Sequence, residues 1–158
     1  MHSFALLLGH LLGDYIFQRD WEAGLKSVHH PTGPRPEVSL PSASLWVPVG
    51  LTEEEKAQKA WDQQAEDARI APKACLLHCL LYTLAVFCTC CWFLPWWAYL
   101  VVFVTHYPVD RYRLARKFMT ANGQEAFATG VFSPWSIIVV DNIIHLAVLY
   151  VLGLIAVL

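Results

Sequence analysis

Hydrophobic residues gather in four stretches of the 158-residue chain, with polar segments between them. A helix that crosses a bilayer needs about 20 mostly apolar residues. The second and fourth stretches reach that length alone, and the first and third reach it when polar residues at their ends are included. We therefore expect an all-α, polytopic membrane protein: a four-transmembrane-helix bundle forming a single domain over residues 1–158, with spans at 3–21, 74–94, 96–112 and 134–157.

The first stretch has a rival interpretation as a cleaved signal peptide. Such a peptide begins with basic residues and ends its apolar run at a small-residue cleavage site. Residues Met1 to Phe4 include no Lys or Arg, and His10 and Asp14 interrupt the apolar run. We therefore expect the stretch to be retained as a membrane helix.

Composition and charge support a membrane location. The chain is 56% hydrophobic and 15% charged, whereas soluble domains carry about 25% charged residues. All 11 Lys and Arg residues lie either between the first two stretches or directly after the third. Basic loops stay in the cytoplasm, so we expect an inner (cytoplasmic) membrane protein with both termini outside. The expected partner is the lipid bilayer; homo-oligomerisation stays open, and a net charge of −2 without a basic stripe gives no reason to expect nucleic acid.

A long cytoplasmic insert, residues 29–70, separates the first two predicted spans. Its first part, 29–50, is rich in proline and predicts an irregular loop. From Thr52 to Ile70 the residues favour a helix, and Thr52 with Glu55 forms a capping-box pattern. The apolar face of this amphipathic helix is thin. It could lie on the membrane through Trp61 or dock on a partner, although a solvated spacer is the simpler interpretation.

Five cysteines lie in the second hydrophobic stretch, at positions 75, 79, 88, 90 and 91. A disulfide framework spreads its cysteines over loops. Clustered on one helix, these residues are interpreted as small apolar packing residues.

Histidine and aspartate recur at helical spacing in three of the four predicted spans. Residues four apart share a helix face, and each pair presents an imidazole and a carboxylate to the same side. The first and third spans run inward and the fourth runs outward, so the aspartate is nearer the cytoplasm in every pair. Asp14, His78, His106 and Asp141 are expected about one to two turns into the membrane. The second span adds one histidine. The resulting set of candidate metal ligands is His10, Asp14, His78, His106, Asp110, Asp141 and His145.

Simpler explanations exist for single members of this set. One histidine can be a packing residue, and Asp110 could pair with Arg111 or Arg113. A buried membrane aspartate, however, costs about 2.5 to 3.5 kcal/mol, and repeating that cost favours one shared polar site, either self-paired or holding a cation. Histidine and carboxylate ligands suit a divalent Zn, Mn, Fe or Ni ion.

Other residues could support such a site. Asp14 and Asp141 are the candidate catalytic general bases. Gln18, Tyr82 and Arg111 are candidates for supporting the ligands or binding substrate. Gly9 and Gly13 would let a neighbouring helix approach His10 closely.

The combination of motifs resembles a known family. The run His10-Leu-Leu-Gly-Asp14-Tyr-Ile-Phe-Gln18 is followed by Trp21 and Lys26, His78 with Tyr82, His106 with Asp110, and Asp141 with His145. This pattern resembles the bacterial and phage membrane family catalogued as domain of unknown function 3307 (DUF3307). The resemblance implies a small polytopic membrane protein and supplies no activity. The chain departs from the family in its longer insert, 29–70, and in Asn142, which stands where the family pattern leads us to expect Gln.

The leading functional hypothesis is a metal-dependent membrane hydrolase acting on a membrane-associated substrate. The metal would activate water, and a carboxylate would accept its proton. One alternative is a transporter or channel for a divalent cation or protons, using the same residues. Another is a non-enzymatic scaffold whose polar layer only fixes helix register.

Overall fold

The computed structural model describes residues 1–37 and 51–157. The described part is all-α and contains no strand, which confirms the all-α part of the predicted fold class. The helices are α1 (His2–Leu11), α2 (Asp20–Leu25), α3 (Glu53–Cys90), α4 (Trp96–Arg111), α5 (Leu114–Ala121), α6 (Glu125–Thr129) and α7 (Trp135–Val157), and a short π-helix, η1 (Leu12–Ile16), directly continues α1.

Two of the described helices, α3 and α7, are long and apolar enough to cross a membrane by length and composition. The 16-residue α4 measures about 24 Å at 1.5 Å per residue, and α1 has 10 residues before η1 begins. The first predicted span, 3–21, is shorter than expected because the helix ends at Ile16 and the chain turns before α2. A count of four spans therefore stays a prediction.

The helix predicted in the insert and the second predicted span form one continuous 38-residue helix, α3. Its start follows the predicted capping box: Thr52 Oγ1 accepts from the Glu55 N–H at 3.2 Å, and the Glu55 carboxylate accepts from the Thr52 N–H at 2.7 Å. The expected break before residue 74 is absent. Pro72 lies inside the helix, where it lacks an N–H and its ring crowds the carbonyl four residues back, but α3 continues through it.

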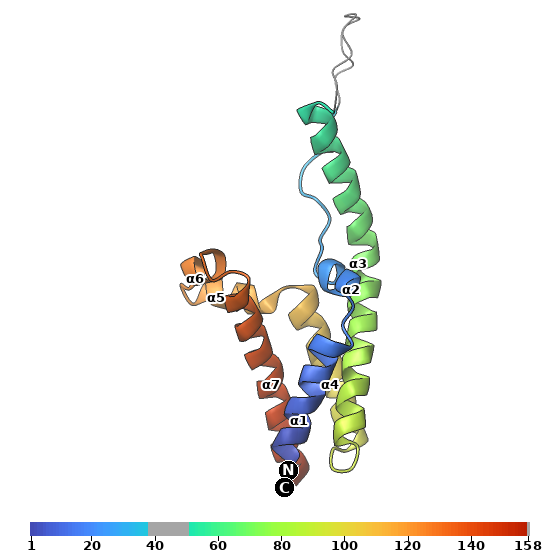
Figure 1. Ribbon diagram of the computed structural model, residues 1–158, viewed down its shortest axis with the longest axis vertical. Helices are drawn as coiled ribbons and strands as arrows, with labels where there is room; N and C mark the ends of the chain where they lie inside the picture. Colours follow the sequence, from blue (N-terminus) through green and yellow to red (C-terminus); the bar gives the residue numbers. More distant parts are fainter. Residues whose placement is uncertain (38–50, 158) are drawn as a thin grey trace, which may run out of the picture.

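The N-terminal half of α3 extends beyond the other helices, and the segment after α2 runs back along it (Figure 1). Arg35 donates two hydrogen bonds of 2.7 and 2.6 Å to Asp62. This contact lowers the pKa of the Asp62 carboxyl below its usual value. Gln64 donates to the His29 carbonyl at 3.1 Å. The insert helix is therefore covered on one side by its own chain. The rest of the predicted proline-rich loop, 38–50, lies outside the described residues.

Helices α1, α3, α4 and α7 pack side by side, with both chain termini at the same end of the bundle (Figure 1). The apolar core is built from all four helices and the α3–α4 connection: Leu6, Tyr82, Val86, Cys90, Leu94, Ala98, Val102, Leu149 and Leu152. All five cysteines are free thiols, with Cys88 and Cys91 exposed and the other three buried. Cys75, Cys79 and Cys90 are buried, as expected for packing residues, whereas the exposure of Cys88 and Cys91 does not fit that prediction.

Helix α1 and η1 lie against α3 at two glycines. A Cβ atom at Gly9 would sit 2.5 Å from Thr89 Oγ1, and one at Gly13 would sit 2.5 Å from Tyr82 Cδ2 and 3.1 Å from Tyr82 Cα. Only glycine permits this approach. The predicted close contact beside His10 is confirmed, and α3 is the neighbouring helix.

Replacing Gly13 by alanine is expected to destabilise the protein by about 1 to 3 kcal/mol, the usual cost of overpacking. The added methyl group must displace Tyr82 or push the first helix away from α3. Denaturant unfolding of the detergent-solubilised protein measures the change. Gly24→Ala is the matched control, because nothing lies within 4 Å of its added Cβ. Equal stability of the two variants would contradict the close packing.

Candidate metal centre

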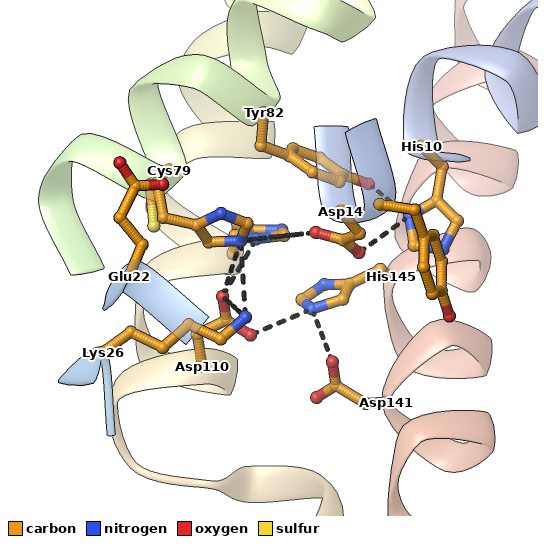
Figure 2. Close-up of polar contacts among 12 residues, drawn as sticks. His10, Asp14, Glu22, Lys26, Cys79, Tyr82, Asp110, Asp141 and His145 are labelled. Atoms are coloured by element: carbon orange, nitrogen blue, oxygen red, sulfur yellow. Dashed lines mark hydrogen bonds and ion pairs between the residues drawn. The ribbon is translucent and has the colours of Figure 1, made fainter. Parts of the chain in front are cut away.

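The seven predicted ligands come together in one cluster, inside the bundle. Figure 2 shows the labelled side chains of His10, Asp14, Asp110 and His145 directed toward a common region. Each predicted pair is in contact: His10 Nδ1 lies 3.3 Å from Asp14 Oδ2, His106 Nε2 lies 3.2 Å from Asp110 Oδ2, and His145 Nε2 lies 3.4 Å from Asp141 Oδ2.

Asp14 owes its position to the π-helix. The Phe17 N–H bonds to the Leu12 carbonyl at 2.9 Å, five residues back, instead of four. Such widened turns in helices occur frequently at functional sites. Here the turn carries Asp14 between the first helix and α3, where its Oδ1 atom lies 3.3 Å from His78 Nε2.

Four atoms form the centre of the cluster: His78 Nε2, His106 Nε2, Asp14 Oδ1 and Asp110 Oδ2. His78 Nε2 is 3.0 Å from His106 Nε2 and 3.0 Å from Asp110 Oδ2. His106 Nε2 is 3.7 Å from Asp14 Oδ1. With the His78–Asp14 and His106–Asp110 contacts, these five distances measure 3.0 to 3.7 Å, so Asp14 and Asp110 each contact both imidazole nitrogens. Ligands bound tetrahedrally at about 2.0 to 2.1 Å lie about 3.3 to 3.4 Å from one another.

An outer layer of histidines contacts the remaining carboxylate oxygens. His10 approaches the second oxygen of Asp14, and His145 Nε2 lies 3.5 Å from the second oxygen of Asp110. His145 in turn contacts Asp141, whose side chain is 27% exposed and thus the most accessible carboxylate of the cluster. Each central carboxylate is therefore held between the centre and one outer imidazole.

Aromatic stacking fixes the ring of His106. Its centroid lies 3.9 Å from that of Tyr82, with 29° between the ring planes, and 4.0 Å from that of His145, with 22° between the planes. The Tyr82 hydroxyl also hydrogen-bonds to His10 Nδ1 at 2.9 Å. Tyr82 thus links the inner and outer layers, consistent with its predicted supporting position.

Lys26 is a member of the cluster that the spacing analysis did not select. Its Nζ donates to Asp110 Oδ2 at 2.9 Å and lies 3.5 Å from His78 Nε2. With its oxygen toward Lys26, the Gln18 amide accepts from Nζ at 2.9 Å and donates to the Asp14 carbonyl at 2.9 Å. Burial lowers the pKa of Lys26, but the negative charges of Asp110 and Asp14 outweigh burial and raise it above its usual value. The side chain is therefore an ammonium ion.

Asn142 also belongs to the cluster. Its oxygen accepts from His10 Nε2 at 2.6 Å, and its nitrogen donates to the Tyr15 hydroxyl at 2.5 Å and to the Ile138 carbonyl at 2.8 Å. The amide orients His10 and does not face the central atoms. The spacing of His10 and Asp14 on one helix does not indicate which residue of another helix will bond to His10, so this role of Asn142 could not be predicted from the sequence.

Arg111 lies outside the cluster. Its Nη1 atom donates to the Val28 carbonyl at 2.7 Å, which ties the segment after α2 to the end of α4. The structure therefore does not bring this predicted substrate-binding residue to the site.

Several buried atoms in the cluster have no hydrogen-bond partner. Asp14 Oδ1 and His145 Nε2 approach other polar atoms without hydrogen-bond geometry, and the Nδ1 atoms of His78 and His106 have no partner either. Unpaired buried polar atoms are costly. With neutral imidazoles, the three carboxylates face the single positive charge of Lys26, so a divalent cation would balance the excess.

Two overlapping groups of these side chains could hold a metal ion: Asp14, His78 and His106, and His106, Asp110 and His145. Within each group, the candidate ligand atoms lie within 4.8 Å of one another. His106 belongs to both groups and offers Nε2 to both. Because a neutral imidazole nitrogen has one lone pair, the groups describe alternative positions for one ion.

A cavity of about 450 Å³ adjoins the cluster and opens to the surface. Asp14, Lys26, Asp110, Asp141 and Asn142 contribute to its wall. A small molecule in this cavity would reach the central carboxylates directly.

Comparison with known proteins adds no assignment to this geometry. The resemblance to domain of unknown function 3307 stays a prediction. No family model matches the chain, and neither a curated protein nor a solved structure matches it.

Proposed function

We propose that the chain is an integral membrane protein whose His/Asp cluster binds one divalent metal ion and hydrolyses a membrane-associated substrate. The single observation that carries the proposal is that Asp14 and Asp110 each bring one carboxylate oxygen within 3.0 to 3.7 Å of the same two imidazole nitrogens, those of His78 and His106, beside an open cavity. The transporter and scaffold hypotheses share the buried cluster, but a cavity beside it is what a hydrolase additionally needs.

Asp14, His78 and His106 are the proposed protein ligands. Catalytic zinc sites have three protein ligands and leave the fourth position to water or substrate, whereas structural sites use four. Asp110 Oδ2 also contacts both imidazole nitrogens, but Lys26 already binds it. We therefore assign Asp110 as the group that accepts a proton from the activated water, with Asp141 next in the chain of contacts through His145.

Zinc fits this donor set best among the four metals considered. Two imidazole nitrogens and one carboxylate oxygen are a typical ligand set of catalytic zinc, whereas manganese favours six oxygen ligands. The outer residues His10 and His145 then orient the carboxylates, as second-layer partners do in other metal sites.

The outer faces of the helices support the membrane location. Large apolar side chains are exposed on α1, α3, α4 and α7, including Phe4, Leu80, Leu84, Leu100, Val104, Ile143 and Val151. Exposed apolar surface of this extent is typical of lipid-facing or interaction surfaces. In the proposed arrangement, α1 with η1, the C-terminal half of α3, α4 and α7 enter the bilayer, and the basic segments face the cytoplasm. The shorter α1 and α4 would require local thinning of the bilayer.

Hydrolysis of a panel of generic p-nitrophenyl esters and phosphoesters tests the function. The purified protein is expected to release p-nitrophenol in the presence of zinc, to lose this activity in chelator, and to regain it on adding zinc. His78→Ala should be inactive under all conditions, whereas His29→Ala should match the parent, because the His29 side chain is exposed and its ring hydrogen-bonds to the Ser27 carbonyl, away from the cluster. Zinc flux into liposomes without any hydrolysis would contradict the enzyme and support a transporter.

A further inference from the structure

The cavity beside the cluster has a cationic wall opposite in charge to its carboxylates. Arg113 and Arg116 both line it, together with apolar residues that include Val109, Ile137 and Ile138. Arg113 is the residue directly before α5, and Arg116 lies in the first turn of that helix. No acidic residue is present in this first turn. The positive end of the helix dipole therefore adds to the two side-chain charges.

Neither arginine is neutralised by the protein. Arg113 Nε donates to Ser27 Oγ at 2.8 Å, and within residues 1–37 and 51–157 neither guanidinium forms an ion pair with a carboxylate. Most of the N–H groups of both side chains are thus left for a ligand. A guanidinium binds phosphate through two parallel hydrogen bonds. Two guanidiniums together offer more donors than a single carboxylate ligand can accept, which favours a phosphoryl group as the ligand.

The backbone at Arg113 is held in an unusual conformation. Its φ of 51° and ψ of 49° lie in the left-handed region, and Arg113 is the only non-glycine residue with positive φ in the described part of the chain. This region is strained for a residue with a Cβ and is found at functional sites more often than elsewhere. A glycine would adopt this conformation without strain. The protein instead has an arginine here, and that arginine lines the cavity.

Exposed aromatic and apolar residues flank the same end of the bundle. They follow Arg116 along the chain: Phe118, Phe127, Val131, Phe132 and Trp135. Tryptophan is enriched at the membrane–water interface, and Trp135 is exposed here among other apolar side chains. Figure 1 shows α5 and α6 together at the end of α7 that lies away from the chain termini. The cationic wall thus lies beside side chains suited to the headgroup level of a bilayer.

We infer that the cavity binds the phosphoryl group of an anionic ligand, which Arg113 and Arg116 hold next to the His/Asp cluster. The placement of this group next to a working metal centre rests on the proposed function; the phosphoryl site itself does not. The ligand is either a phospholipid headgroup or a soluble phosphate ester, and both present the same group to the arginines.

Calorimetric titration of the full-length protein in detergent with inorganic phosphate tests the site. Arg113→Gln and Arg116→Gln are each expected to weaken binding about tenfold or more, the effect of losing hydrogen bonds to a charged group. Lys117→Gln is the matched control: it removes one positive charge from the same helix, but Lys117 lies over the Tyr112 ring and does not line the cavity. Its affinity should stay within about twofold of the parent. Equal weakening in all three variants, or no phosphate binding by the parent, would overturn the inference.

Arg113→Gly separates a binding role from a folding role. Glycine relieves the left-handed backbone and removes the guanidinium, so this variant should unfold no more easily than the parent and still lose phosphate affinity. A variant that binds phosphate like the parent would contradict the role of Arg113.

Two further arms distinguish the ligand sources and the dependence on metal. In the first arm, phosphate binding is measured in nanodiscs that contain phosphatidic acid in place of phosphatidylcholine. If the ligand is a lipid headgroup, phosphatidic acid should compete with inorganic phosphate for Arg113 and Arg116. No inhibition would assign the site to soluble phosphate esters. Arginine-dependent phosphate binding by a protein that retains no metal would support this site and reject the proposed hydrolase. Metal binding without arginine-dependent phosphate binding would do the reverse.

Discussion

Replacing Asp110 by asparagine in chelator-treated protein is expected to lower the free energy of unfolding by about 3 to 5 kcal/mol, the cost of breaking a buried ion pair from one side. The Asp110 side chain is 2% exposed and lies 2.9 Å from Lys26 Nζ. It also contacts all three histidines nearest to it, His78, His106 and His145. Asparagine keeps the shape but leaves the largely buried Lys26 ammonium without the carboxylate to which it donates.

Asp141→Asn is the matched control for this prediction. Asp141 is partly exposed and makes a single contact, with His145, so its loss should cost about 1 kcal/mol or less. Denaturant unfolding in detergent compares the two variants. The double variant Lys26→Met with Asp110→Asn should cost clearly less than the sum of its single changes, because the pair interacts directly. Additive costs would show that Lys26 and Asp110 do not stabilise each other.

Substitutions of the inner and outer histidines are expected to lower the zinc affinity to two different degrees. His78→Ala and His106→Ala each remove a proposed ligand, and should abolish stoichiometric binding of zinc. His10→Ala and His145→Ala remove only the outer partners of Asp14 and Asp110 and should weaken zinc about 10- to 100-fold. Competition titration with a chromophoric chelator measures all four affinities under one set of conditions.

His2→Ala is the control for the metal series, because His2 stacks on Phe93 at the other end of α1 and makes no contact with the cluster. It should bind zinc like the parent. Equal losses in all four cluster variants would remove the distinction between inner and outer layers. Greater loss in His10→Ala or His145→Ala than in His78→Ala would move the ion to another position in the cluster.

The three His/Asp pairs could be predicted from the sequence because helical spacing is a local property. His106 and Asp110 meet on α4, and Asp141 and His145 meet on α7, wherever those helices lie. The capping box at Thr52 is local in the same sense. The close approach at Gly13 was predictable from residue size, although the identity of α3 as the neighbour was not.

Residues contributed by the tertiary fold could not be predicted in this way. Lys26 reaches Asp110 only because the chain turns after η1 and α2 packs against α3. The π-helical turn at Asp14 has no spacing signal, and neither has the hydrogen bond that joins Asn142 to His10 across two helices. The division into inner and outer ligands likewise depends on where four helices place their side chains. The sequence therefore predicts the His/Asp pairs within each helix, but not the contacts that join residues of different helices.

X-ray absorption spectroscopy of the metal-loaded protein tests the central claim most directly, after elemental analysis of the same sample. The account predicts one divalent ion per chain with four nitrogen or oxygen ligands at about 2.0 to 2.1 Å, including the scattering pattern of two imidazoles. His78→Ala protein loaded in parallel should retain no ion. A parent protein that binds no metal after loading and desalting, or one whose ion is bound by cysteine sulfur at about 2.3 Å, would contradict it.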